Sequence, residues 1–199
     1  EKDRFIIKIN NRKIFQGILE FFEIKDPKQS LTILRSIDKF QTVGKKGVLE
    51  LLTKGRLDKS GDFTKGANLK KEIAEEIFEL LSADSIIRDK KTGVCRLSAG
   101  DSLFKIENDT YLEGLKQVDT ILNYLGKNKE VNIMSTDLSF EQDMMNFQMD
   151  LSVVRGLEYY TGTVMEAETT DTSFWKSSRD ANAFKKIKLG SLSGGGRYD

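Results

Sequence analysis

The chain has 199 residues, of which 38% are hydrophobic and 32% are charged, and its formal net charge is +1. This composition supports one sizeable domain, or a domain with a smaller insertion, and argues against a disordered chain. No apolar run approaches the roughly 18 residues of a membrane helix, and the first residues lack signal-peptide character, so we expect a cytoplasmic protein. The average charge gives no attraction to nucleic acid, so such contact requires a local basic patch.

The cysteine and histidine counts exclude several chemistries. The chain has one cysteine, Cys95, and no histidine. An internal disulfide, a multi-cysteine zinc site and histidine-ligated metals are therefore excluded within the chain, as are imidazole bases and Ser-His-Asp hydrolysis. We expect no metal ligands of its own, and any catalysis must use placed charges, carboxylates, hydroxyls or backbone dipoles.

The first part of the chain is predicted to be mostly helical. Residues 5–9 read as a strand, and Asn10 and Asn11 can cap the helix that follows. The stretch at residues 54–71 has the composition of a loop, with three glycines and six basic residues against two acidic ones. Apolar residues at helical spacing predict helices near residues 14–22, 31–40, 48–52, 68–81, 103–106 and 111–125.

After Gly126 the apolar pattern changes to a period of two. It predicts strands at residues 131–134, 147–154, 163–168 and 189–193. Most of these strands are linked by short turns and not by crossover helices, which favours a largely antiparallel sheet. The sequence therefore predicts an α+β fold, with a helical insertion between the first strand and the others.

The segment RGLEYYTG, residues 155–162, is the first candidate site. We expect it to form a hairpin connection, where a sheet can present side chains to a ligand. Arg155 can offer paired donors to a phosphate or carboxylate. Tyr159 and Tyr160 can each stack on a ring and form a hydrogen bond, while the two glycines permit close backbone approach. The alternative is a pair of half-buried aromatic residues at a strand end.

The segment SGGGRYD, residues 193–199, is the second candidate site. Its three consecutive glycines at a strand end would let a ligand lie directly against the backbone, beside Arg197 and Tyr198. The alternative is a plain turn or linker.

Together these segments resemble a known family. RGLEYYTGTVMEAE and GGGRYD closely resemble the two signature sequences of histidyl-tRNA synthetases, which are class II ligases. FIIKINNRK and IDKFQTVGKKGV resemble the stretch after that family's second class II motif, and GRLDKSGDFTKGANL resembles the insertion of one bacterial branch. The resemblance spans nearly the whole chain, in the family's order. It implies a class II antiparallel sheet, with catalytic core at residues 1–40 and 130–199 and a helical insertion domain at residues 41–129.

The resemblance also implies an activity. The family activates histidine with ATP and Mg²⁺ to histidyl-adenylate and then esterifies tRNA(His), and we expect a homodimeric protein. Arg155 matches the catalytic arginine between the substrate carboxylate and the α-phosphate, and Tyr160 matches the tyrosine that reads the imidazole. By this resemblance the expected substrate-binding residues are Tyr159, Tyr160, Gly194, Gly195, Gly196 and Tyr198.

The insertion domain of this family lies over the tRNA acceptor stem. A basic excess at residues 54–71 suits phosphate contact, and the candidate tRNA-binding residues are Lys54, Arg56, Lys59 and Lys65. The alternative for this stretch, and for the basic stretch at residues 176–188, is simple solvation.

The chain lacks the three class II motifs and the anticodon-binding domain, so we expect a part of a longer protein that is inactive alone. An alternative function is that of a non-catalytic, histidyl-tRNA synthetase-like regulatory or sensor subunit, since such relatives can keep parts of the same segments. Arg155 and the basic insertion favour the enzyme. A stand-alone RNA-binding module would leave residues 155–162 unexplained.

Overall fold

The computed structural model describes residues 5–58, 60–83, 85–88, 95–99, 102–125, 146–169 and 191–198. Within these residues no helix is both long and apolar enough to cross a membrane. The helices and strands, in chain order, are β1 (Phe5–Asn11), α1 (Arg12–Phe21), α2 (Pro27–Asp38), α3 (Phe40–Leu52), β2 (Gly55–Leu57), β3 (Phe63–Lys65), α4 (Lys71–Leu81), β4 (Ser85–Arg88), β5 (Cys95–Ala99), β6 (Ser102–Leu103), α5 (Asp109–Leu125), β7 (Asn146–Met149), β8 (Thr163–Thr169) and β9 (Ser191–Gly196).

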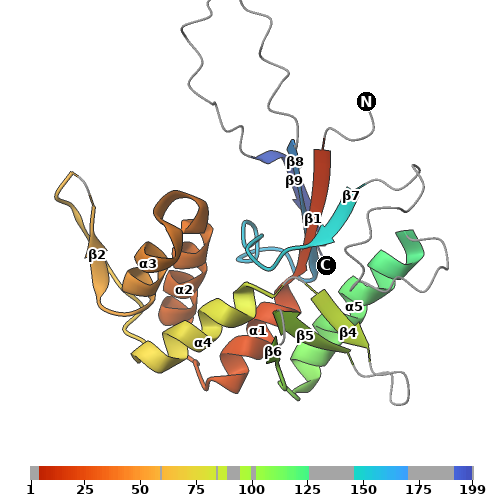
Figure 1. The fold of residues 1–199 in the computed structure, drawn as a ribbon, viewed down its shortest axis with the longest axis horizontal. Helices are drawn as coiled ribbons and strands as arrows, with labels where there is room; N and C mark the ends of the chain where they lie inside the picture. Colours follow the sequence, from red (N-terminus) through yellow and green to blue (C-terminus); the bar gives the residue numbers. More distant parts are fainter. Residues whose placement is uncertain are drawn as a thin grey trace, which may run out of the picture.

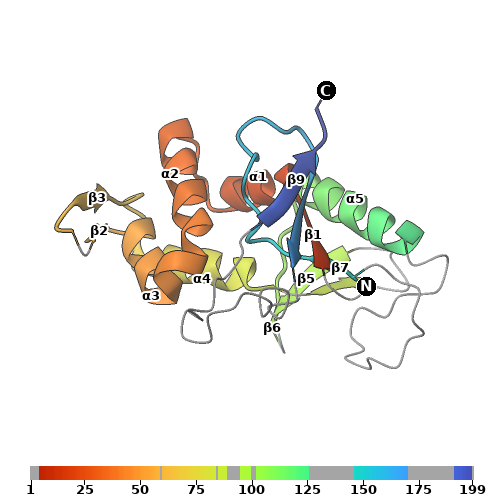
Figure 2. The ribbon, with the colours of Figure 1, turned by 90° about the horizontal axis from the view of Figure 1, so that it is seen from above.

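The main sheet has the strand order β7-β1-β8-β9. Strand β8 runs antiparallel to both of its neighbours, whereas β7 runs parallel to β1. The α+β class is confirmed, but the sheet is mixed and not purely antiparallel. Figure 1 shows this sheet between α2 and α3 on one side and α5 on the other, and Figure 2 gives the same arrangement from above.

Strand β1 divides its side chains between the two faces of the sheet, as a period of two requires. On one face Ile9 is fully buried, in a hydrophobic cluster that includes Ile14 of α1 and Leu115 of α5. On the other face Lys8 and Asn10 contact the segment that follows β7. One face of β1 thus packs on the helices, and the other carries polar contacts.

Two hydrophobic clusters hold the described residues together. The first joins β1, α1 and α5 with α4 and the strands β4 and β5. The second joins α1 to α4 with the loop after β7, and it includes Val153, Val154 and Val164. Each cluster draws on residues from both sides of position 40, so the insertion shares its core with the rest of the chain. The division at residues 41 and 129 stays a prediction.

Local capping explains where the first helices begin. The side chain of Asn11 accepts a hydrogen bond from Lys13 N at 2.9 Å, which caps α1 as the sequence predicted. Asp26 caps α2 in the same way, and Pro27 occupies its first turn, where a missing N–H has no cost. These two sequence signals therefore fix the starts of α1 and α2.

The middle of the chain contains strands that the sequence did not predict. β2 and β3 form a hairpin within the expected loop, and β4, β5 and β6 form a small antiparallel sheet. The helix expected at residues 103–106 is wrong: Leu103 ends β6, and Phe104 N donates to Leu97 O at 3.0 Å, so this segment pairs with β5 instead.

The predicted strand boundaries also shift near the candidate sites. The strand expected at residues 147–154 ends at Met149, because the Asp150 carboxylate accepts from both Ser152 N and Ser152 Oγ and turns the chain. Strand β9 extends to Gly196, so the glycine triplet lies within a strand and not after it. The predicted strand at residues 131–134 and the basic stretch at 176–188 lie outside the described residues.

Candidate functional site

The first candidate segment is a crossing loop and not a hairpin. Strands β7 and β8 both pair with β1, on its two edges, so the chain between them must pass over β1. Residues 150–162 make this connection and carry Arg155, Tyr159 and Tyr160 across the sheet. The expectation of a hairpin was wrong, because period-two patterns do not reveal which strands are neighbours.

The ring of Tyr160 lies against two glycines. A Cβ atom on Gly156 would come within 2.5 Å of the ring, and a Cβ on Gly196 would come within 2.6 Å. Gly156 also has a φ of +83°, which strongly favours glycine, and its carbonyl accepts from Tyr160 N at 2.8 Å. Both glycines are therefore required for the ring to occupy this position.

Three of the predicted residues form an aromatic cluster. The ring centroids of Tyr160 and Tyr198 lie 4.7 Å apart, and those of Tyr159 and Tyr160 lie 4.5 Å apart. Tyr159 is 54% exposed and Tyr198 is 67% exposed, and their rings stack at 6.0 Å. A hydrogen bond with Tyr198, with some desolvation, raises the pKa of Tyr160 to about 12. The cluster thus presents accessible ring surface and a hydroxyl that stays protonated at neutral pH.

A small cavity brings most of the predicted residues together. Its volume is about 200 Å³, below the roughly 300–1,000 Å³ of sites for drug-sized ligands. The predicted site residues that line it are Arg155, Tyr159, Tyr160, Gly194 and Gly195. Two predicted residues lie beside the lining: Gly196 lies under the Tyr160 ring, and Tyr198 packs against both other tyrosines.

The sequence prediction missed Glu166, which also lines this cavity. Its carboxylate lies 3.9 Å from the Arg155 guanidinium, and its side chain is 17% exposed whereas that of Arg155 is 70% exposed. This distance is too long for a hydrogen bond, so the two charges attract each other without a fixed geometry. The alternation of β8 puts Glu166 on the same face as buried Val164. The two-residue spacing of Val164 and Glu166 is visible in the sequence. The sequence does not show that this face of β8 lies at the cavity.

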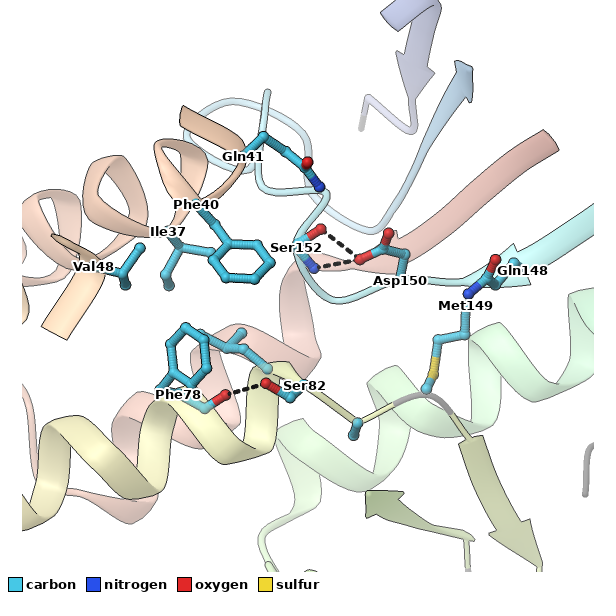
Figure 3. A pocket seen from close by; sticks show the side chains of 12 residues that line it. Ile37, Phe40, Gln41, Val48, Phe78, Ser82, Gln148, Met149, Asp150 and Ser152 are labelled. Atoms are coloured by element: carbon cyan, nitrogen blue, oxygen red, sulfur yellow. Dashed lines mark hydrogen bonds between the residues drawn. The ribbon is translucent and has the colours of Figure 1, made fainter. Parts of the chain in front are cut away.

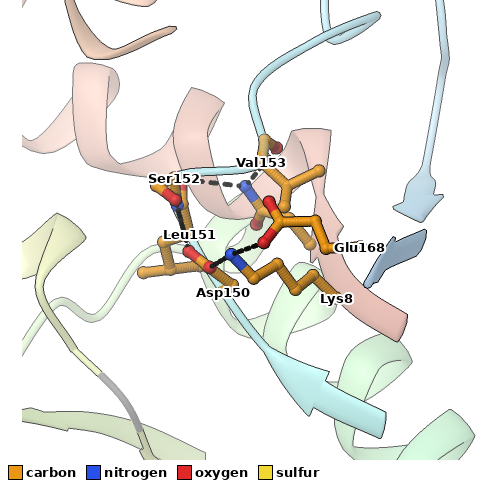
Figure 4. Close-up of polar contacts among 7 residues, drawn as sticks. Lys8, Asp150, Leu151, Ser152, Val153 and Glu168 are labelled. Atoms are coloured by element: carbon orange, nitrogen blue, oxygen red, sulfur yellow. Dashed lines mark hydrogen bonds and ion pairs between the residues drawn. The ribbon is translucent and has the colours of Figure 1, made fainter. Parts of the chain in front are cut away.

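Three residues, two on β1 and one at the start of α1, contact the crossing loop or the strand after it. Lys8 forms ion pairs with Asp150 at 3.0 Å and with Glu168 at 2.9 Å (Figure 4). Asn10 Nδ2 donates to two backbone carbonyls of the loop, those of Leu151 and Val153. Arg12 Nη1 donates to Tyr160 O at 3.1 Å. No local pattern in the sequence indicated these contacts, which join residues far apart in the chain.

A second and larger cavity lies between the start of the loop and helices α2 to α4 (Figure 3). Its volume is about 300 Å³, and apolar side chains of α2, α3 and α4 form much of its lining, including Phe40 and Phe78. Asp150 and Ser152 line its opposite wall. None of the predicted site residues contributes to this lining.

Three of the candidate tRNA-binding residues are described, and they lie on the β2–β3 hairpin or directly before it. Lys54 and Lys65 are exposed, whereas Arg56 is half-buried and its guanidinium lies 3.4 Å from Glu50. Lys59 lies outside the described residues. The exposed side chains of Leu57 and Phe63 are cross-strand partners on this hairpin.

The described residues do not form a magnesium site by themselves. Within the part of the chain that the structure describes, no three acidic, cysteine or histidine side chains group so that they could hold a metal ion. Glu166 is the sole carboxylate in the described lining of the small cavity. Mg²⁺ usually keeps several waters and binds substrate phosphates, so we assign it no ligand here.

Comparisons with known proteins identify relatives along the whole chain. No family model matches it. The chain is 38% identical to the histidine–tRNA ligase of Caulobacter vibrioides over 196 residues, which cover 98% of the chain and 34% of the relative. It is 38% identical to the histidine–tRNA ligase of Bartonella bacilliformis over 204 residues, which cover all of the chain and 36% of the relative.

A solved structure supports the fold. The crystal structure of histidyl-tRNA synthetase from Nostoc sp. PCC 7120 matches 84% of the chain and 32% of that protein, with a TM-score of 0.52 and 21% identity. The chain thus spans about a third of the length of the relatives it matches. Over that third, it belongs to the histidine–tRNA ligase family, as the resemblance indicated.

Proposed function

We propose that this chain is the histidine-recognising part of a longer histidine–tRNA ligase, which joins histidine to tRNA(His) in two steps. The observation that supports this function is the small cavity, because one guanidinium, two tyrosines and two backbone glycines converge on it. A guanidinium suits a carboxylate or a phosphate, and the tyrosines suit a flat polar ring. Histidine offers both a carboxylate and such a ring.

In the first step, Arg155 stabilises charge. A carboxylate oxygen of histidine forms a bond to the α-phosphorus of ATP, the bond from phosphorus to the bridging oxygen breaks, and pyrophosphate leaves. The attacking carboxylate and the α-phosphate are both anionic, so an exposed guanidinium between them offsets their repulsion. Donors placed in this way typically contribute about 10²–10³ in rate. An ionised carboxylate needs no general base, so the absence of histidine from the chain removes nothing from this step.

Tyr160 is the proposed reader of the imidazole ring. Its hydroxyl is a neutral hydrogen-bonding group throughout the physiological range, and the rise of its pKa to about 12 extends that state to higher pH. A polar pocket of this kind can discriminate by about 10⁴–10⁵ against analogues that leave its groups unpaired. The rings of Tyr159 and Tyr198 both pack against the ring of Tyr160, and Tyr159 also lines the cavity.

The remaining partners follow from the family. ATP is a substrate, and Mg²⁺ enters with it. The exposed lysines of the β2–β3 hairpin, Lys54 and Lys65, are proposed to contact tRNA phosphates. We expect the longer protein to be a cytoplasmic homodimer.

Histidine-dependent exchange between ATP and labelled pyrophosphate tests this function in the full-length protein. We expect exchange with histidine and none without it, and none from the 199-residue chain alone, which spans about a third of its relatives. Histidine binding by the full-length protein without exchange would instead identify a regulatory or sensor subunit. Arg155 argues against that outcome, because a protein that only binds histidine has no developing phosphate charge to neutralise.

A further inference from the structure

The start of the crossing loop is held by charge. Lys8 Nζ lies between the carboxylates of Asp150 and Glu168, and its side chain is 13% exposed. Burial lowers the pKa of Lys8, but the hydrogen bonds with Glu168 and Asp150 outweigh burial and leave that pKa above the usual lysine value. The second Asp150 oxygen accepts from Ser152 N and Ser152 Oγ, so one carboxylate joins β1 to the turn that begins the loop (Figure 4).

The next part of the loop is held by a buried amide. Asn10 lies two residues after Lys8 on the same face of β1, and its Nδ2 donates to Leu151 O at 3.2 Å and to Val153 O at 3.0 Å. These carbonyls belong to the turn at residues 150–153, so both bonds act on the segment that leads directly to Arg155. Buried donors and acceptors of this kind are costly to leave unpaired, which makes the arrangement specific.

Asp150 and Ser152 have little packing on the side away from β1, whereas Leu151 and Val153 are buried in the two hydrophobic clusters. Asp150 and Ser152 line the cavity of about 300 Å³ that separates them from Phe40 and Phe78 (Figure 3). A void supplies no van der Waals contact to the groups that line it. The positions of Asp150 and Ser152 therefore depend on the polar contacts from β1, while Leu151 adds apolar packing between them.

We propose that Lys8 and Asn10 are positioning residues that set the place of the Arg155 guanidinium in the active site. This inference rests on the proposed function, in which Arg155 acts on the reacting carboxylate and phosphate. Neither residue reaches the small cavity, so both act through the loop. A displacement of about 1 Å in a reacting geometry can cost about 10²-fold in rate.

The far end of the loop is held separately. Arg12 Nη1 donates to Tyr160 O, and Thr161 N donates to Arg197 O at 2.9 Å. Loss of the Lys8 contacts should therefore move Arg155 while Tyr160 stays in place. We therefore expect loss of the Lys8 contacts to slow the chemical step, and loss of the Arg12 contact to weaken histidine binding.

Pyrophosphate exchange by the full-length protein tests the kinetic effects expected of these positioning residues. Lys8→Met should lower kcat by about 10- to 100-fold and change the KM for histidine by less than about threefold, whereas Arg12→Met should mainly raise that KM. Lys8→Arg, which keeps the charge, should restore most of the lost rate. Asp150→Asn keeps an oxygen for Ser152 but loses the charge, so it should match Lys8→Met, and the double variant should be no worse than either.

Lys13→Met is the matched control, since Lys13 also pairs with a carboxylate, that of Glu113 on α5, but does not touch the loop. It should leave kcat and KM unchanged. The proposal is overturned if Lys8→Met behaves like Lys13→Met, if it changes kcat and KM together, or if Lys8→Arg restores nothing.

Hydrogen exchange in the unliganded full-length protein tests the loop contacts without any activity. Lys8→Met should speed amide exchange at Ser152 and Val154, and Lys13→Met should not. Unchanged protection at both amides in Lys8→Met would refute the positioning role. A parent protein without histidine-dependent exchange would refute the proposed function, and the hydrogen-exchange result would still decide whether Lys8 fixes the loop.

Discussion

The backbone of Gly196 lies directly beneath the ring of Tyr160. A Cβ atom on Gly196 would come within 2.6 Å of Tyr160 Cγ and within 2.8 Å of both neighbouring ring carbons. Strand β9 thus approaches the loop after β7 more closely than any residue with a side chain would allow. The two signature segments of the sequence are therefore parts of one packing arrangement, in which the glycines of one accommodate the tyrosine of the other.

Gly196→Ala should displace the Tyr160 ring. Overpacking of this kind costs about 1–3 kcal/mol, which lowers the melting temperature by about 2–4 °C per kcal/mol in a chain of this size. Gly195→Ala is the matched control, because it makes the same change on the same strand with nothing within 4 Å of the added carbon. Thermal unfolding of the two variants measures the difference. Equal melting temperatures would show that the ring moves aside without cost.

Arg155→Ala should abolish activation of histidine with little effect on stability. The side chain is mostly exposed and its ion pair with Glu166 is long, so its removal should change the free energy of unfolding by less than about 0.5 kcal/mol. Arg35→Ala is the control, because Arg35 is also exposed and pairs with Glu158 at 3.7 Å. Pyrophosphate exchange should distinguish the two variants, whereas urea unfolding should give them similar stability. A large loss of stability in Arg155→Ala would assign that side chain a structural role.

Much of the first half of the fold could be predicted because its signals are local. Asn11 caps a helix whose apolar residues recur at helical spacing, and Pro27 marks the start of the next helix. Such signals act over a few residues and are visible in the sequence. The strands β2 and β3 were missed because three residues are too few to establish a period of two.

The candidate site divides in the same way. Arg155 and the tyrosines were found from an unusual local composition, and the glycines from their run. Glu166 and Lys8 were missed, because their roles depend on which strands pair. Asn10 and Leu151 are 141 positions apart, and no local pattern indicates that the chain after β7 returns to β1. The missed residues therefore join the site only through the order in which the strands pair, which the sequence did not reveal.

The titration of Tyr160 should be displaced to high pH. Its hydrogen bond with Tyr198 is the main cause that raises its pKa from 10 to about 12. A raised pKa in the folded state means that this contribution to stability is fully present below pH 10 and is lost as the pH rises through about 12. Phenolate absorbance of the wild type against Tyr160→Phe isolates this group. Tyr198→Phe should lower the midpoint toward 10, and an unchanged midpoint would exclude Tyr198 as the cause.

The β2–β3 hairpin should contribute to tRNA binding in proportion to the exposure of its charges. Lys65 is exposed on β3, whereas Arg56 is half-buried beside Glu50, so Lys65 is free to neutralise a phosphate and Arg56 is partly neutralised already. In the full-length protein, Lys65→Ala should reduce the slope of log K against log salt by about 1, and Arg56→Ala should reduce it less. Lys116→Ala is the control, since Lys116 is also exposed but lies on α5, across the sheet from the hairpin (Figure 1). If Lys65→Ala and Lys116→Ala leave the same slope, the hairpin is a solvated loop, and its exposed Leu57 and Phe63 need another explanation.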